Sequence, residues 1–95
     1  MQTIDAKRFE EYYGVTEIAL EKAKSASESL SLKNARKEFI DTVERYLFDA
    51  RHFFEKGDYV NAFAAVNYAH GWLDAGARIG LWVVKDSKLF AVDEE

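Results

Sequence analysis

Apolar and small residues recur every three or four positions over most of the chain, which is the spacing of one face of an α-helix. In the first segment this row consists of Phe9, Tyr12, Thr16, Ala19, Ala23, Ala26 and Leu30. In the second segment it consists of Phe39, Val43, Tyr46, Ala50 and Phe53, with Ile40, Leu47 and Phe54 at its side. The pattern predicts two helices, over about residues 3–30 and 33–56, each with one apolar face.

Residues that favour helix ends separate the predicted helices. Ser29 or Ser31 could cap the free amides at the start of the second helix. Gly57 is followed directly by Asp58; glycine accepts the left-handed backbone that ends a helix, and aspartate caps the next one. This tight reversal predicts an antiparallel hairpin between the second helix and a third, over residues 58–81.

The third segment, DYVNAFAAVNYAHGWLDAGARIGL, is the most apolar part of the chain. At about 100° per residue, one side should face the core, with Ala62, Val66, Ala69, Leu73, Ala77 and Gly80. The opposite side carries a polar stripe, defined as Asn67, His70, Asp74 and Arg78. Much of the remaining arc is an apolar patch, defined as Tyr68, Trp72, Ala75 and Ile79. Because a helix this apolar is normally covered on more than one side, a partner chain or the tail is expected to cover it.

The tail, residues 82–95, contains two short runs with β-propensity, Trp82–Val84 and Leu89–Val92, around a polar segment. They predict a small hairpin or an extended segment that lays Trp82, Leu89 and Phe90 on the helices. The expected fold is therefore all-α: one domain over residues 1–95, built as a three-helix up-and-down bundle with a short C-terminal β-hairpin-like or extended tail.

The composition excludes or disfavours several classes of function. The 95 residues are 48% hydrophobic and carry a formal net charge of −4, so the overall field repels nucleic acid. The absence of cysteine excludes disulfides and thiolate metal sites. Neither a basic-then-apolar leader nor an apolar run of membrane-spanning length occurs. We therefore expect a cytoplasmic protein with no membrane or nucleic-acid partner, no cofactor and no metal.

The polar stripe of the third helix permits two interpretations. Its steps of three and four residues allow a shared hydrogen-bond network, and Asp74 and Arg78 have the spacing of an ordinary surface ion pair. Alternatively, the stripe is a small-ligand or hydrolytic site in which His70 titrates near neutral pH and Arg78 receives an anion. Few acid–base sites are built from one helix, and no carboxylate of the second helix, such as Asp49, is predicted to face it. A catalytic role is the less favoured interpretation.

The apolar patch favours a different kind of function. Trp and Tyr are enriched where protein interfaces concentrate their binding energy, so Tyr68 and Trp72 mark a candidate interface unless the tail covers them. The sequence thus predicts a non-enzymatic interaction or assembly module that uses its third helix. Its partner is expected to be a second copy of the chain, in a homodimer, or another protein.

Residues 46–81, YLFDARHFFEKGDYVNAFAAVNYAHGWLDAGARIGL, closely resemble an archaeal family known as domain of unknown function 357. The segment NYAHGWLDAGAR is the most specific part of this resemblance. The resemblance implies an all-α up-and-down three-helix bundle from an archaeal cytoplasm. It implies no activity, cofactor or substrate.

Two weaker resemblances give less information about fold and function than the family resemblance does. Ala50, Phe53, Gly57, Tyr59, Ala62 and Ala69 are similar to one tetratricopeptide-type hairpin, but such repeats need about three stacked units. Arg45 and His52 have the spacing of an Arg-(four to six residues)-His signature found in helical ribonuclease and nucleotidyltransferase-associated domains. RNA processing is therefore a third possibility, which the net negative charge disfavours.

Overall fold

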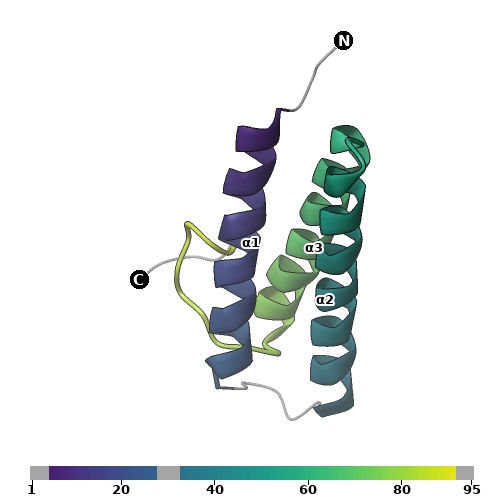
Figure 1. The fold of residues 1–95 in the computed structure, drawn as a ribbon. Coiled ribbons are helices and arrows are strands. Elements are labelled where there is room, and N and C mark those ends of the chain that lie inside the picture. The colour runs from purple at the N-terminus through teal and green to yellow at the C-terminus, as the bar shows by residue number, and fades with distance from the viewer. Residues whose placement is uncertain (1–4, 28–32, 92–95) are drawn as a thin grey trace.

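The computed structural model describes residues 5–27 and 33–91, and these form three helices that run down, up and down in the view of Figure 1. Helix α1 spans Ala6–Ser25, α2 spans Lys33–Glu55 and α3 spans Tyr59–Ile79. The predicted all-α three-helix bundle is confirmed. Helix α1 ends at Ser25, before the predicted end at residue 30, because Ala26 has an extended backbone. The predicted caps Ser29 and Ser31 lie outside the described residues.

Helix ends follow the capping chemistry of their residues. Asp58 caps α3 by accepting a 3.2 Å hydrogen bond from the Asn61 amide. Gly57 has φ +81°, and the Asp58 amide donates back to the Phe53 carbonyl oxygen at 2.9 Å. This hydrogen bond belongs to a helix-ending motif that places a glycine in the left-handed region. The same motif recurs at the end of α3, where Gly80 has φ +85°. Gly57 and Asp58 therefore form the predicted reversal between α2 and α3.

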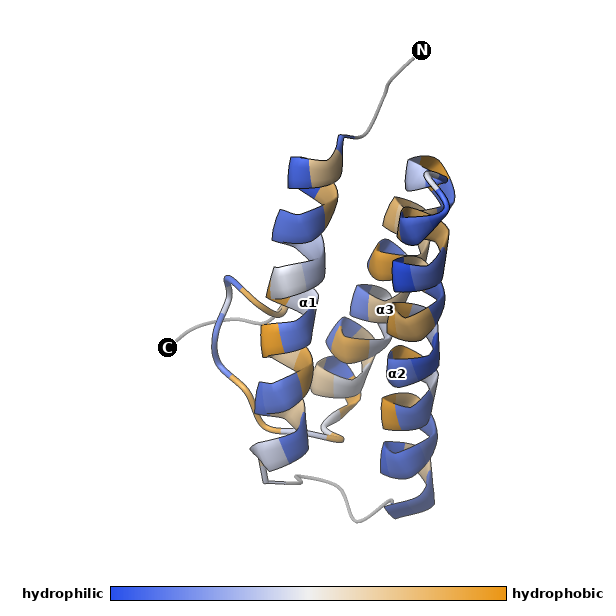
Figure 2. Ribbon diagram, in the orientation of Figure 1, coloured by the Kyte–Doolittle hydropathy of each residue, from blue (hydrophilic) through white to orange (hydrophobic). Residues whose placement is uncertain are grey.

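Helix α3 is the centre of the bundle. It packs along α2 and along α1, whereas α1 and α2 approach each other least. Its core side contains the small residues Ala62, Ala65, Ala69 and Gly76, which allow close approach of its neighbours. In Figure 2 the outer side of α2 is hydrophilic along nearly its whole length. The larger buried side chains include Phe9, Leu20, Val43, Leu47, Val66 and Leu73.

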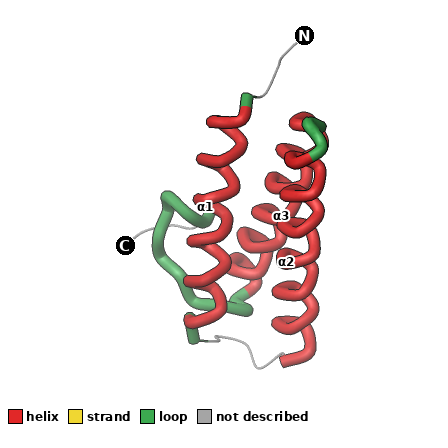
Figure 3. The backbone as a smooth tube through the Cα atoms, viewed as in Figure 1, coloured by secondary structure: helices red, strands yellow, loops and turns green. Residues whose placement is uncertain are grey.

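The tail packs as an irregular loop. Its described part, residues 81–91, contains no strand, so the predicted β-hairpin is not found there (Figure 3). Asp86 forms a turn instead: its carbonyl oxygen accepts from the amides of Leu89 and Phe90, at 3.1 and 2.9 Å. Trp82, Leu89 and Phe90 are buried, as the apolar runs predicted, and Leu81 is buried as well.

The tail lies beside α1, on the side away from α2 (Figure 1). The Val83 amide donates to the Ser27 carbonyl oxygen at 2.9 Å, and Lys22 pairs with Asp86 at 3.1 Å. Trp82 occupies a notch at Gly76, where an added Cβ would overlap its ring. Gly76 therefore makes room for the tail on α3.

Candidate functional site

The side of α3 that faces away from the bundle is exposed over four turns. We define this α3 outer face as Ala64, Asn67, Tyr68, Gly71, Ala75 and Arg78, all of which are exposed. Among these six residues Arg78 is the only charged one, although Asp, Glu, Lys and Arg make up 32% of the chain. An exposed helix surface with so little charge is typical of a contact surface.

An apolar hollow of about 340 Å³ lies on the α2 side of this face, lined by Phe39, Asn67, Tyr68, Gly71, Trp72 and Ala75. Aromatic pairs form its wall. Trp72 packs edge-to-face on Phe39 with ring centroids 4.8 Å apart, and Tyr68 packs edge-to-face on Tyr46 at 4.6 Å. Such contacts hold both rings in place and leave the hollow preformed.

The predicted apolar patch forms part of this hollow. Tyr68 is 54% exposed and Ile79 is 49% exposed, while Trp72 is half-buried by its contact with Phe39. The tail was one of the two predicted covers, but its described part lies on the α1 side of α3. The patch is therefore uncovered within the described chain.

A polar hollow of about 320 Å³ lies on the opposite, α1 side of the same face, lined by Tyr12, Val15, Thr16, Asn67, His70, Gly71, Asp74 and Lys88. It is bounded by α1, α3 and the tail. Asn67 and Gly71 line both hollows, so they form the ridge between them. The α3 outer face thus has one almost wholly apolar side and one more polar side, where His70, Asp74 and Lys88 stand beside Tyr12 and Val15.

A chain of contacts joins α1, α3 and the tail at the wall of the polar hollow. The Thr16 hydroxyl lies 3.1 Å from His70 Nδ1, and His70 Nε2 lies 3.6 Å from Asp74 Oδ1. The same carboxylate oxygen accepts a 2.9 Å hydrogen bond from the Ala91 amide. Which group donates depends on the imidazole tautomer: with the ring proton on Nε2, facing the carboxylate, Nδ1 accepts from the hydroxyl. This network fixes the tail and α1 on α3.

The polar stripe is therefore divided. His70 and Asp74 belong to the network, Asn67 sits on the ridge, and Arg78 is exposed further along α3. Asp74 and Arg78, both described, form no ion pair, because Asp74 contacts His70 and Ala91 instead. Thr16 is 1% exposed, so its hydroxyl is not open to a substrate. No α2 residue lines the polar hollow, which leaves His70 without the second-helix carboxylate that an acid–base site would need.

The other predicted sites are not assembled. Arg45 and His52 lie on the exposed side of α2, about 10 Å apart along its axis, and neither lines a hollow described above. Within residues 5–27 and 33–91, no group of three or more His, Cys, Asp or Glu side chains could hold a metal ion. None of the described helices has both the length and the apolar character needed to cross a membrane.

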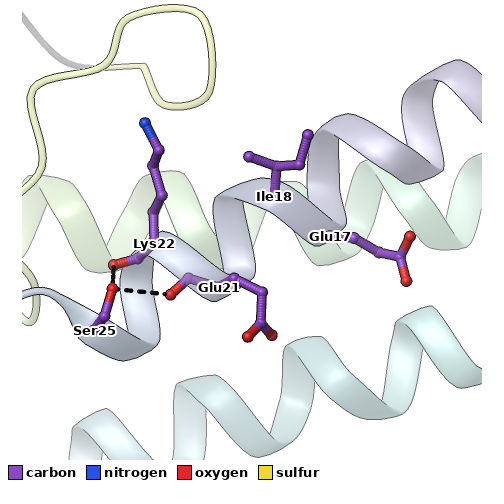
Figure 4. A pocket seen from close by; sticks show the side chains of 5 residues that line it. All are labelled: Glu17, Ile18, Glu21, Lys22 and Ser25. Carbon is purple, nitrogen blue, oxygen red and sulfur yellow. Dashed lines mark hydrogen bonds between the residues drawn. The ribbon is translucent and has the colours of Figure 1, made fainter.

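A third hollow, of about 480 Å³, lies on α1 (Figure 4). Its lining comes from one helix: Glu17, Ile18, Glu21, Lys22 and Ser25. The Ser25 hydroxyl donates to the carbonyl oxygens of Glu21 and Lys22, and the Lys22 ammonium pairs with Asp86 of the tail. Because its lining comes from one helix, this open surface forms no candidate site.

Two arginines organise the structure without having been singled out in the sequence. Arg36 donates to the carbonyl oxygens of Ala23 and Leu81, each at 3.0 Å, and so joins the end of α1 to the start of the tail. Arg51 binds Glu10 through both carboxylate oxygens, at 2.9 and 3.0 Å. The hydrogen bonds from Arg51 lower the pKa of Glu10. Arg36 lies in the helical register of the apolar row Phe39 to Phe53, and Arg51 lies in the register of its flank, Leu47 and Phe54.

Comparison with protein families shows to which family the chain belongs. The model of the family described as "Protein of unknown function (DUF357)" matches residues 11–82, and the chain belongs to this family. The match confirms the resemblance of residues 46–81 and extends it over most of α1 and the whole of α2. Neither curated proteins nor solved structures give a match.

Proposed function

We propose that the protein is a non-enzymatic assembly module that forms a homodimer through the α3 outer face. The observation that carries this proposal is an exposed helix surface with one charged residue, beside a preformed aromatic hollow. The proposed setting is the cytoplasm of an archaeal cell, as the family resemblance implies.

The dimensions of the face suit this role. From Ala64 to Arg78 it is about 21 Å long, and the seams with α1 and α2 widen it on both sides. Stable protein interfaces bury roughly 800 Å² on each partner. Burying apolar surface contributes about 25 cal/mol per Å², and the tyrosine and tryptophan beside the ridge are of the type that dominates interface energies. The face therefore offers anchoring side chains along a length of about 21 Å, and the seams with α1 and α2 must supply the rest of the buried area.

A small-ligand site in the polar hollow is the second candidate function. The hollow beside His70 favours it, since a ligand site requires such a concave space. The ring nitrogens of His70 are already engaged by Thr16 and Asp74, however. Displacing them would release α1 and the tail, so we favour assembly.

Light scattering across micromolar concentrations tests the proposal. The expected result is a dimer that Tyr68→Ala shifts towards monomer, because the substitution removes a ring from the interface. Ile18→Ala is the matched control: Ile18 is also 54% exposed but points away from the bundle on α1. A wild-type chain that stays monomeric throughout, or equal effects of the two substitutions, would refute the proposal.

A further inference from the structure

We infer that the two copies cross antiparallel at Gly71, with the two-fold axis perpendicular to α3 and in the plane of the interface. The inference rests on the proposed function and names the orientation of the partner. It follows from the different character of the two sides of the α3 outer face.

For two α3 helices that pack along each other, two-fold symmetry allows two arrangements. In a two-fold dimer the same surface is used by both copies. When two facing helices run antiparallel, the α2 side of one copy meets the α2 side of the other. When they run parallel, the α2 side of one copy meets the α1 side of the other. The orientation therefore decides which hollow faces which.

The antiparallel arrangement matches like with like. It places the two apolar hollows together and the two polar hollows together. The parallel arrangement instead sets Tyr68 and Trp72 against the partner's His70 and Asp74. Burying polar groups against aromatic rings without new hydrogen bonds costs free energy. Polarity thus favours the antiparallel pair.

Residue positions become complementary around Gly71. In an antiparallel crossing, a residue before Gly71 faces the residues of the partner that lie about as far after Gly71 on the same side of the face. Tyr68 then projects towards the partner's Ala75, at the small-residue end of the apolar hollow. Asn67 comes beside the partner's Asp74 on the polar side. An amide donor facing a carboxylate acceptor is a favourable pair, and the symmetry forms it twice.

Arg78, the single charged residue of the α3 outer face, also favours the antiparallel arrangement. Two Arg78 side chains would stand side by side in a parallel pair and repel each other. In the antiparallel pair they lie about 21 Å apart along the helices, well beyond the screening length of about 8 Å at physiological salt. The helix dipoles also oppose each other in this arrangement.

Gly71 suits the centre of the crossing. A Cβ added there would meet nothing within 4 Å in the single chain, so the monomer does not need glycine at this position for space. An exposed glycine does allow a partner backbone to approach closely. Ala64 and Ala75, on either side of it, keep the ridge low.

Single-cysteine variants test the orientation cleanly, because the chain contains no cysteine. The variants are Gly71→Cys, Ala64→Cys and Arg78→Cys, with Ile18→Cys as a control on α1. Gly71→Cys should form a disulfide dimer under mild oxidation. Ala64→Cys and Arg78→Cys should each stay uncrosslinked alone and crosslink through a short bis-maleimide when mixed. The control should stay uncrosslinked.

The possible outcomes separate the two proposals. Self-crosslinking of Ala64→Cys and of Arg78→Cys as readily as Gly71→Cys would show a parallel pair and overturn the inference. A dimer by light scattering without any of these crosslinks would place the interface elsewhere and also overturn it. A monomeric parent chain would overturn the proposed function itself. If Gly71→Cys is monomeric, the mixed Ala64→Cys and Arg78→Cys pair decides the orientation alone.

Discussion

The indole ring of Trp82 lies against the backbone of Gly76, in the space that the Cβ of any other residue would occupy. The ring is 1% exposed, and its Nε1 donates a 3.0 Å hydrogen bond to the carbonyl oxygen of Leu73. This contact fixes the start of the tail on α3. It directs the tail to the α1 side of α3 and so leaves the α3 outer face uncovered.

Gly76→Ala should destabilise the protein by about 1–3 kcal/mol, because the added methyl forces Trp82 out of its notch. Gly71→Ala is the matched control on the same helix. Its Cβ meets nothing within 4 Å, so the better helix propensity of alanine should stabilise the monomer by about 0.5–1 kcal/mol. Urea unfolding measures both. Equal changes for the two substitutions would contradict the packing described for Trp82.

Arg36→Ala should cost about 1.5–3 kcal/mol, since it removes charged hydrogen bonds to the carbonyl oxygens of Ala23 and Leu81. Arg36→Lys should recover only part of this loss, because an ammonium lacks the fork that reaches several carbonyl groups at once. Hydrogen exchange should locate the change at the end of α1 and the start of the tail. Full stability of the lysine variant would show that charge alone matters.

The stability of the fold should fall as the pH is lowered below about 4.5. The hydrogen bonds from Arg51 lower the pKa of Glu10 from its ordinary value of 4.5, and those from Lys22 lower the pKa of Asp86 from 3.8. A carboxyl group whose pKa is lower in the folded state stabilises that state at higher pH. This contribution is lost as the pH falls through the folded-state pKa.

Thermal unfolding from pH 6 to pH 2 measures this dependence. Glu10→Gln should make the fall in stability shallower, and high salt should do the same, because the ion pair is exposed to solvent. The effect should be small for the same reason. A steeper fall in Glu10→Gln would contradict the assignment.

Thr16→Val should destabilise the fold by about 0.5–1.5 kcal/mol. The substitution keeps the shape of a buried side chain but removes the hydroxyl that contacts His70 Nδ1. Thr16→Ser, which keeps the hydroxyl, serves as the control for the hydrogen bond. Nitrogen NMR of the imidazole should show the proton on Nε2 in the parent chain. A ring protonated on Nδ1 instead would exclude donation from Thr16.

The three helices could be predicted from the spacing of apolar residues, because each helix buries one side and that burial determines the spacing. Val43 and Ala50 of the α2 row are buried, as are Ala62, Val66, Ala69 and Leu73 on the predicted core side of α3. Gly57 and Asp58 marked the reversal correctly, since their preferences are local. Features decided within a few residues along the chain were thus accessible from the sequence.

Features that depend on contacts between distant segments could not be predicted from the sequence. Trp82 begins a run with β-propensity, but its contact with Gly76 and the turn at Asp86 determine the path of the tail. The polar stripe was predicted from the helical register of α3 alone. That register does not show that Thr16 of α1 contacts His70 or that Ala91 of the tail binds Asp74. The long side chains of Arg36 and Arg51 likewise find their partners only after the helices have packed.

The central claim is that the α3 outer face joins two copies of the chain, and sedimentation equilibrium of Gly71→Glu tests it most directly. The substitution places a carboxylate in open space on the monomer, so the fold should remain stable. In the dimer it would bury two unpaired charges, which should weaken association by about 3 kcal/mol or more, roughly a hundredfold in Kd. We expect a wild-type dimer and a folded, monomeric variant. A variant that dimerises as tightly as the wild type, or a wild type that is monomeric, would contradict the central claim.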